Sequence, residues 1–320
     1  MPIRDAFYDV SIILCSHNRA EHLKKTLHSL RGVKVPDGWT AEVLLVDNAS
    51  TDTTPKVMRA FKHSEMPVHV VREENQGLSH ARNRSVDEAQ GRVLLFTDDD
   101  VRFPSGWIQG MSQPILNGPA DAVAGGVELA EEVQEDWMTA RHRELLASTE
   151  RIDPEQPARM VGANMAIGHH VFDVIPEFDT KLGAGQLGAG EETLFSYQLQ
   201  EAEFRIETAF DVAIRHHPDR SRLSRESWMD AARKSGRAGA YLSYHWEHRK
   251  HSLIALYVGL TYHRLRLFWR RLMNSFTEDD DGMPIKEFHL QRKIHRIRQH
   301  LREHGRPQKY NRRRLSNRDA

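Results

Sequence analysis

The sequence predicts an α/β fold, a mostly parallel sheet flanked by helices, followed by an α-helical C-terminal region. Three observations support this prediction. Short apolar runs alternate with helical segments between residues 8 and 125, polar clusters follow the ends of those runs, and residues beyond 226 show helical patterns throughout. The 320 residues are 39% hydrophobic and 28% charged, which is typical of a globular chain of one to three domains.

The first part of the chain contains four apolar runs that read as buried strands, at residues 10–14, 43–46, 68–71 and 93–96. Signals for helix starts lie between these runs, at Asn18 with Glu21 (a capping-box spacing), at Thr54 before Pro55, and at Ser79. We expect Gly91 to close the third of these helices. Strands that alternate with helices in this way favour a parallel sheet.

The rest of the chain divides by composition. Residues 126–225 are less regular, with a glycine-rich stretch at 183–190 and a helix expected from about Glu191 to Ala202. Residues 226–281 read as a helical extension, and residues 282–320 as a basic tail that is helical or partly disordered.

Charge is unevenly distributed along the chain. Lys and Arg number 45, as do Asp and Glu, so the net charge is zero and offers no support for a nucleic-acid binder. Residues 282–320 hold twelve Lys/Arg and three Asp/Glu, a net charge of +9, so the first 281 residues carry −9. We expect an acidic hinge at 278–282 before the last helix, and a solvated triplet at Arg312–Arg314.

The single cysteine, Cys15, excludes an internal disulfide framework and a cysteine-based zinc site. The N-terminal residues lack the apolar core of a secretory signal. The longest strongly apolar run, Leu253–Leu260, is far shorter than the ~20 residues of a spanning helix. These features predict a cytoplasmic protein.

Polar clusters follow three of the predicted strands, at Ser16–Arg19, Asp47–Asp52 and Thr97–Asp100. Ligands of open parallel sheets bind beyond the carboxyl ends of the strands, so these clusters predict one site. Asp98 and Asp100 point the same way in an extended segment, and two such carboxylates favour a hard divalent cation between them. The alternative is a solvated acidic turn.

A family resemblance rests on seven blocks in order. They are the segments 10–19, 45–54, 75–84, 96–100 and 162–166, Phe178-Asp179 with 190–195, and 214–218 with Arg222-Leu-Ser224. Together these blocks, spread over roughly residues 8–240, resemble family 2 glycosyltransferases. The resemblance implies a GT-A fold over residues 1–225, with a nucleotide-binding half at 8–125 and an acceptor half at 126–225. It also implies an enzyme that uses nucleotide-activated sugars with inversion.

The resemblance implies a nucleotide site bordered by the loop after the first strand. The residues placed there are Ser16, Asn18, Arg19, Asp47, Asn48 and Arg82. Many relatives carry Asp at both positions where this chain has Asp47 and Asn48, so we expect Asp47 to read the base. A carboxylate accepts from the imide N–H of uracil or thymine, which favours a UDP- or TDP-sugar. For Arg82 the alternative is an exposed helix arginine.

The aspartate triplet matches the family's D-x-D motif. The resemblance implies that Asp98 and Asp99 meet the ribose or sugar and that Asp100, with Asp98, holds Mn²⁺ or Mg²⁺. It also implies that His216 completes the contacts to the metal or the diphosphate, with His217 as the alternative. Such a metal would neutralise charge on the departing nucleoside diphosphate.

Glu191 and Glu192 match the family's Glu-Asp pair at a helix start, which implies a carboxylate that takes the proton of the acceptor hydroxyl. We assign the base to Glu192, and expect Glu191 to cap the helix or touch the acceptor. The glycine-rich stretch 183–190 is either a lid over the acceptor or a passive loop. It is no P-loop, because no Gly-Lys-Ser/Thr follows.

The sequence departs from the processive synthases of the family, since their Gln-x-x-Arg-Trp signature and membrane spans are missing. A single sugar transfer to a glycan or lipid-linked acceptor therefore fits better. Residues 253–269 form a basic amphipathic segment that either lies on an anionic membrane or builds a helical hairpin or homodimer. We expect a deletion after Gly282 to spare nucleotide binding, because every candidate site residue precedes Pro218.

Two other classes compete with this interpretation. Sugar-nucleotide pyrophosphorylases have a similar sheet, but they carry a glycine-rich activating loop where this chain has Ser16–Arg19. A non-catalytic interaction protein on the same scaffold is the second alternative. The aspartate triplet and the glutamate pair argue against it.

Overall fold

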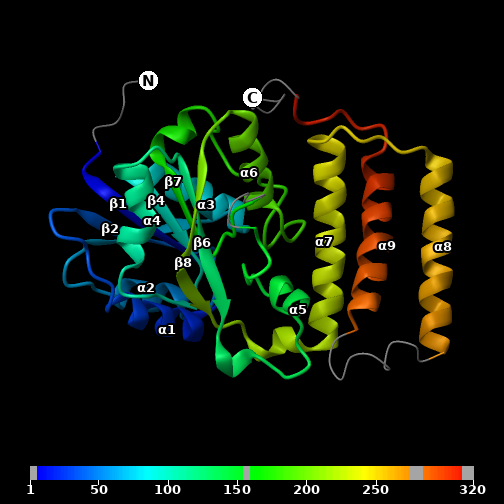
Figure 1. Ribbon diagram of the computed structural model, residues 1–320, viewed down its shortest axis with the longest axis horizontal. Helices are drawn as coiled ribbons and strands as arrows, with labels where there is room; N and C mark the ends of the chain where they lie inside the picture. Colours follow the sequence, from blue (N-terminus) through cyan, green and yellow to red (C-terminus); the bar gives the residue numbers. More distant parts are fainter. Residues whose placement is uncertain (1–5, 154–158, 274–283, 312–320) are drawn as a thin grey trace.

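The computed structural model describes residues 6–153, 159–273 and 284–311. Its centre is one eight-stranded sheet in the order β3-β2-β1-β4-β7-β6-β8-β5 (Figure 1). The strands are β1 (Tyr8–Ser16), β2 (Ala41–Asn48), β3 (Val68–Glu73), β4 (Gly91–Thr97), β5 (Val101–Arg102), β6 (Ala122–Leu129), β7 (Asn164–Gly168) and β8 (Ile206–His216). β3, β2, β1 and β4 run parallel, whereas β7 is antiparallel to β4 and to β6. The predicted α/β class with a mostly parallel sheet is confirmed.

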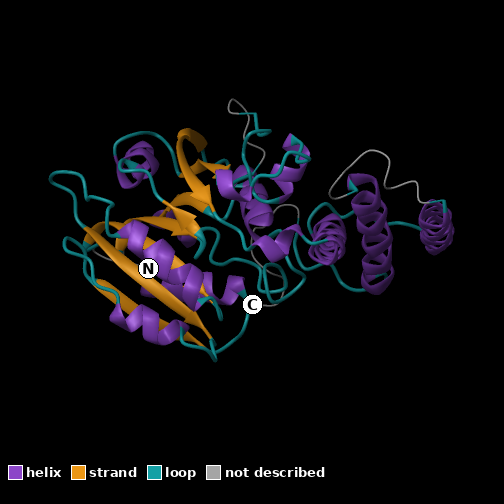
Figure 2. Cartoon of the chain, turned by 90° about the horizontal axis from the view of Figure 1, so that it is seen from below, coloured by secondary structure: helices purple, strands orange, loops and turns teal. Residues whose placement is uncertain are grey.

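Helices cover both faces of the sheet (Figure 2). The bounds of all described helices, including those of the C-terminal extension, follow in chain order. The helices are α1 (Ala20–Leu30), α2 (Thr54–Ala60), α3 (Leu78–Glu88), α4 (Trp107–Leu116), α5 (Ala140–Leu145), α6 (Glu191–Glu201), α7 (Arg225–His245), α8 (Leu253–Leu272) and α9 (Ile285–Glu303). Side chains alternate across each strand, so Ile12 packs with α1, α2 and α4 while Ile13 packs with α3 and α6. The central strands are buried on both faces, which is why they read as unbroken apolar runs.

The four predicted strands are present, but three of the local helix signals are wrong. Asn18 does not cap α1, because its side-chain oxygen accepts from the backbone N–H of Thr51 instead. The N-cap of α2 is Thr53 rather than Thr54. Gly91 closes no helix, since α3 ends at Glu88 and Gly91 begins β4.

The helical extension consists of α7, α9 and α8 in that spatial order, with α9 between the other two (Figure 1). Glu287 of α9 has a fully buried side chain, and its carboxylate accepts from Arg225 at the start of α7 and from Arg271 near the end of α8. A Cβ on Gly236 would stand 2.4 Å from the carbonyl oxygen of Arg292, so glycine lets α7 and α9 approach closely.

The basic stretch after Gly282 is therefore part of the packed molecule over residues 284–311. That a deletion after Gly282 spares nucleotide binding stays a prediction, although the deletion would also uncover α7 and α8. The predicted hinge at 278–282 and the triplet Arg312–Arg314 lie outside the described residues. None of the described helices combines the length and the apolar character needed to cross a bilayer.

Candidate active site

A cavity of about 350 Å³ lies beyond the carboxyl ends of β1, β2 and β4, where the sequence predicts a site. Its lining combines predicted and unpredicted residues: Cys15, Ser16, His17, Arg19, Asn48, Gln76, Gly77, Leu78, Ala81, Asp98, Asp99, Asp100, Ala147, Ala184, Gly185, His216 and Arg222. A larger hollow of about 520 Å³ between α1 and α2 contains no carboxylate, so we assign no chemistry to it.

Arg19 joins two members of the aspartate triplet that follows β4. Its Nε donates to Asp99 Oδ1 at 2.7 Å and its Nη2 donates to Asp100 Oδ2 at 2.5 Å. The Ser16 hydroxyl also donates to Asp99, at 2.5 Å. Burial raises the pKa of Asp99 to about 7, against the opposing charge of Arg19.

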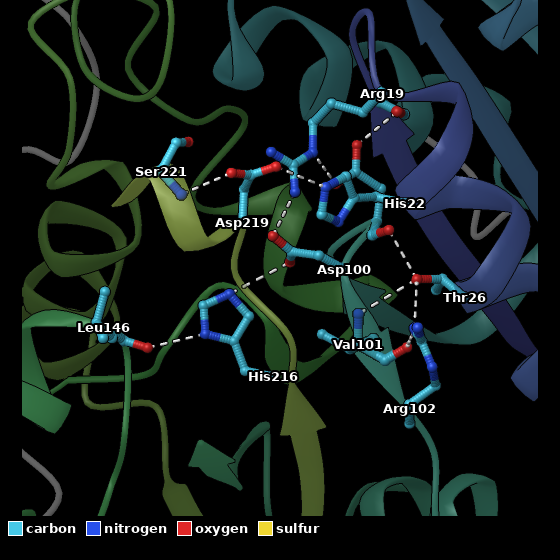
Figure 3. Close-up of polar contacts among 12 residues, drawn as sticks. Arg19, His22, Thr26, Asp100, Val101, Arg102, Leu146, His216, Asp219 and Ser221 are labelled. Atoms are coloured by element: carbon cyan, nitrogen blue, oxygen red, sulfur yellow. Dashed lines mark hydrogen bonds and ion pairs between the residues drawn. The ribbon is translucent and has the colours of Figure 1, made fainter. Parts of the chain in front are cut away.

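Strand pairing brings His216 to Asp100. β5 pairs antiparallel with β8, with Val101 opposite His216, and the backbone N–H of His217 donates to the Asp100 carbonyl at 2.7 Å. The imidazole Nε2 of His216 then lies 3.3 Å from Asp100 Oδ1 (Figure 3). Burial would raise the pKa of Asp100, but the hydrogen bond and charge of His216, with Arg19, hold it well below its usual range.

The pair of Asp100 and His216 fits a divalent cation. His216 Nδ1 lies 2.8 Å from the Leu146 carbonyl, which can only accept, so Nδ1 carries the proton. With a proton on Nε2 as well, the imidazolium donates to Asp100. Without that second proton, the Nε2 lone pair faces a carboxylate oxygen, and a divalent cation could take the place of the proton between them. An imidazole and a carboxylate are a ligand pair suited to Mn²⁺.

The full predicted ligand set is not assembled, because no three metal-ligating side chains gather within the described part of the chain. Asp98 turns instead toward Arg82 Nη2, at 3.8 Å. The alternative ligand His217 points away, with Nδ1 2.7 Å from Glu132. Asp100 and His216 are the two residues placed to share an ion.

Arg82 is buried and is not an exposed helix arginine. Its Nη1 donates to Glu191 at 2.9 Å and its Nη2 to the Gly162 carbonyl at 3.3 Å. A Cβ on Gly162 would lie 2.4 Å from Nη2, so only glycine leaves room for the guanidinium. Arg82 thus links α3 to α6 and to the aspartate triplet.

Glu191 and Glu192 open α6 after Gly190, which has a φ of +95°. The carboxylate of Glu191 pairs with Arg82 and does not cap the helix, and its expected contact with the acceptor stays a prediction. Burial, followed by the neighbouring charge of Glu191, raises the pKa of Glu192 to about 8, although Arg82 opposes the shift. A carboxyl group with this pKa accepts a proton near neutral pH.

Three predicted nucleotide contacts are engaged within the protein. Asp47 lies outside the cavity lining, and its carboxylate accepts from Arg72 at 2.6 Å and from the backbone N–H of Ser50 at 3.1 Å. Asn48 lines the cavity, where its side chain accepts from the N–H of Gly77 and donates to a carbonyl. Asn18 is exposed and organises the loop at Thr51.

The glycine-rich stretch 183–190 forms part of the cavity wall. The Ala184 carbonyl accepts from the N–H of Leu78 at 3.0 Å, and Gln186 donates to the carbonyl of Gln76 at 3.1 Å. Five residues that were not predicted as individual ligand contacts also line the cavity: His17, Gln76, Gly77, Ala147 and Arg222. His17, Gln76, Gly77 and Arg222 lie inside the family blocks, so their positions could have indicated a role, whereas Ala147 lies outside every block.

Fold and site together place a cavity lined by buried carboxylates at the carboxyl edge of a mostly parallel sheet, beside the pair of Asp100 and His216. The model of glycosyl transferase family 2 matches residues 11–175, and the chain belongs to this family.

Sequence relatives match over about a third of the chain. Glycosyltransferase TuaG of Bacillus subtilis (strain 168) is 37% identical over 95 residues, which is 29% of this chain and 36% of that protein. Glycosyltransferase AglE of Haloferax volcanii is 32% identical over 120 residues, 37% of this chain and 39% of that protein. The chain thus spans little more than a third of the length of these relatives.

Solved structures share the GT-A fold. A mannosyltransferase from Pyrobaculum calidifontis, solved with GDP-Man and Mn²⁺, has a TM-score of 0.55 and 18% identity, covering 74% of this chain and 64% of that one. GalNAc-T7, solved with UDP, GalNAc and Mn²⁺, has a TM-score of 0.52 and 18% identity, covering 75% and 51%. The predicted fold class is confirmed by these likenesses.

Proposed function

We propose that this protein is a metal-dependent inverting glycosyltransferase that moves one sugar from a nucleotide-sugar to a hydroxyl acceptor. The observation that carries the proposal is the buried pair of Asp100 and His216, whose facing oxygen and nitrogen atoms lie 3.3 Å apart and are suited to share a cation beside the cavity. The mannosyltransferase and GalNAc-T7 were each solved with Mn²⁺ and a nucleotide or nucleotide-sugar, which supports the same use here.

Asp100 and His216 would hold Mn²⁺ or Mg²⁺, with the diphosphate completing the coordination. When bound, the metal supplies Lewis-acid stabilisation of the leaving diphosphate. Arg19 and Arg222 line the same cavity and add positive charge there. Ser16, Asp98 and Asp99 would contact the ribose or sugar, as the family motif implies.

Glu192 would act as the general base. The acceptor oxygen attacks the anomeric carbon, its proton passes to the Glu192 carboxylate, and the bond from that carbon to the diphosphate oxygen breaks with the electron pair leaving on the diphosphate. Glu191 stays paired with Arg82 and positions the helix start. The raised pKa of Glu192 makes its carboxylate a better proton acceptor than an ordinary glutamate.

The acceptor is proposed to be a glycan or a lipid-linked sugar. TuaG is named for teichuronic acid biosynthesis, which supports a role in polysaccharide assembly. The departures of the sequence from processive synthases favour a single addition. A cytoplasmic location, with the free thiol of Cys15 kept reduced, completes the proposal.

Calorimetric titration with UDP, TDP and GDP, with and without Mn²⁺, tests the metal. We expect Mn²⁺ to tighten nucleotide binding, and Asp100→Ala to remove the metal-dependent part and abolish transfer. Asp211→Ala, at an exposed position of β8, is the matched control. Equal nucleotide affinity with and without metal in the wild type would contradict the proposal.

Product analysis separates the competing classes. Incubation of UDP-, TDP- or GDP-sugars with Mn²⁺ and no acceptor should release the nucleoside diphosphate slowly through transfer to water. Chemistry on pyrophosphate would instead identify a pyrophosphorylase. Absence of both reactions would favour a non-catalytic interaction protein.

A further inference from the structure

The outer face of α8 carries a dense group of exposed apolar side chains. Eight large ones are 54% to 78% exposed, although Leu256 and Leu267 on the same helix are buried. The apolar face consists of Ile254, Tyr257, Val258, Tyr262, Leu265, Phe268, Trp269 and Leu272. Four of these eight side chains are aromatic, a composition favoured where protein meets the lipid–water boundary.

The helix is amphipathic in a specific arrangement. Leu267, with Leu260 beside it, packs against Leu290 and Ile294 of α9. Successive residues are about 100° apart around a helix, so Leu265 stands opposite Leu267 and Leu256, at the middle of the apolar face. Arg264 and Arg266 then fall at its two margins. Both are exposed.

The charge on α8 has one sign. Residues 253–272 contain four arginines and no Asp or Glu. Arg271 forms an ion pair with Glu287, whereas Arg264 and Arg266 form none with the residues that the structure describes. The acidic residues nearest along the chain are Glu247 and Glu278. Positive charges therefore flank the apolar face on both sides. α8 itself is the outermost helix of the extension (Figure 1).

We propose that α8 lies flat on the surface of an anionic lipid bilayer. The apolar face would enter the headgroup boundary, and the arginines at its margins would extend their charged ends to lipid phosphates. No described helix can cross a bilayer, so the contact is with its surface. A second copy is the poorer occupant, because pairing two such faces about a two-fold axis would bring arginine margins together.

Co-sedimentation of the full chain with vesicles tests this proposal. We use equal parts phosphatidylglycerol and phosphatidylcholine, against phosphatidylcholine alone, at low salt and at about 0.5 M NaCl. The wild type should bind the anionic vesicles, and high salt should weaken binding. The double variant Leu265→Glu/Trp269→Glu should lower the partition coefficient at least about tenfold.

Two further variants isolate the effect. Arg264→Gln/Arg266→Gln should remove most of the salt-sensitive part and leave weaker binding. Phe7→Glu/Val174→Glu alters exposed apolar side chains elsewhere on the molecule, 74% and 48% exposed, and should bind like the wild type. Unchanged thermal unfolding would show that each variant is folded.

Three results would overturn the proposal. They are wild-type protein that ignores anionic vesicles at low salt, equal loss of binding in the Phe7→Glu/Val174→Glu control, and a vesicle-free dimer that Leu265→Glu/Trp269→Glu converts to a monomer in light scattering. The last result would assign the face to a second copy. None of these outcomes depends on the transferase activity, so the proposed function is tested separately.

Discussion

Two arginines divide the site carboxylates between them: Arg19 holds Asp99 and Asp100, and Arg82 holds Glu191. Glu192 receives no such ion pair in the described structure, and its pKa rises to about 8. Adjacent carboxylates with unlike surroundings take unlike roles. The assignment of the base therefore rests on environment as well as on the motif.

The glutamate pair yields the first prediction. Glu192→Gln should lower turnover by roughly 10²–10⁴-fold with donor binding intact, because it removes the proton acceptor and keeps the shape. Glu191→Gln should act less on turnover and more on stability, since it breaks a buried ion pair with Arg82. Single-turnover kinetics and thermal unfolding measure the two effects. An exchange of these effects would show that the base is Glu191.

The raised pKa of Glu192 has a second measurable consequence. Its folded pKa of about 8 exceeds the ordinary value of 4.5, so the unfolded chain loses this proton first as pH rises. Folding stability must then fall between about pH 4.5 and 8, and Glu192→Gln should escape that fall. The Tm of the variant minus that of the wild type should therefore increase across this range. If this Tm difference did not change with pH, the pKa of Glu192 would be close to the ordinary value of a glutamate.

Base recognition by Asp47 is the third prediction. The carboxylate would have to exchange Arg72 for a pyrimidine imide, and a charge-assisted hydrogen bond contributes on the order of 1.5–3 kcal/mol. UDP or TDP should then bind roughly tenfold or more tightly than GDP. Titration calorimetry of the three diphosphates checks this expectation, and equal affinities would contradict it.

At the residue scale, the sequence located the triplet and His216, because they lie in quoted blocks. The ion pairs of Asp98 with Arg82 and of Asp47 with Arg72 could not be predicted from the sequence. Those partners stand 16 and 25 residues away in the chain, and only the fold brings them together. Contacts across the fold decide which motif residues remain accessible.

At the scale of elements, long periodic features were predictable and short boundary signals were not. β1, β2 and β4 are buried on both faces, so continuous apolar runs marked them. Asn18, in contrast, carries the expected capping side chain yet has φ +53° and binds a neighbouring loop. The hydrogen bond from the backbone N–H of Thr51 takes the place of the capping bond that the local sequence predicts.

The glycine-rich stretch gives the fourth prediction. Gly185 has φ +87°, and a Cβ there would lie 3.2 Å from Gly77 in the cavity wall. Gly185→Ala should weaken nucleotide binding by about tenfold, because strain of about 1–3 kcal/mol displaces that wall. Gly305→Ala is the matched control, since Gly305 has φ +81° and open space around it. Equal losses in both variants would assign the effect to backbone strain alone.

At the scale of the whole molecule, the extension reaches back to the catalytic domain through Asp179. This fully buried carboxylate accepts from Tyr241 of α7 at 2.8 Å, from Lys309 at 3.0 Å and from Tyr310. Burial would raise its pKa, but Lys309 and the hydrogen bonds hold it below the usual value. Sequence reasoning placed Asp179 in a family block and could not see partners so distant along the chain.

The fifth prediction concerns this contact. Tyr310→Phe should destabilise the protein by about 1–3 kcal/mol, because a buried carboxylate loses one donor. That loss corresponds to a Tm decrease of about 1.5 °C per kcal/mol for a chain of this size. Tyr262→Phe, at a side chain 56% exposed, is the control. If both variants had the same Tm, the hydrogen bond from Tyr310 to Asp179 would not contribute to the stability of the catalytic domain.

The same contact sets an order of events during protein synthesis. Asp179 and Tyr310 are 131 positions apart, so the ribosome must add the whole helical extension after the acceptor half before this carboxylate gains its last partner. Contacts between residues so far apart in the chain form late in folding. Until then, the Asp179 carboxylate of the catalytic domain lacks part of its hydrogen-bond partners. The nascent chain should therefore acquire protease resistance around Asp179 only once residue 310 has emerged.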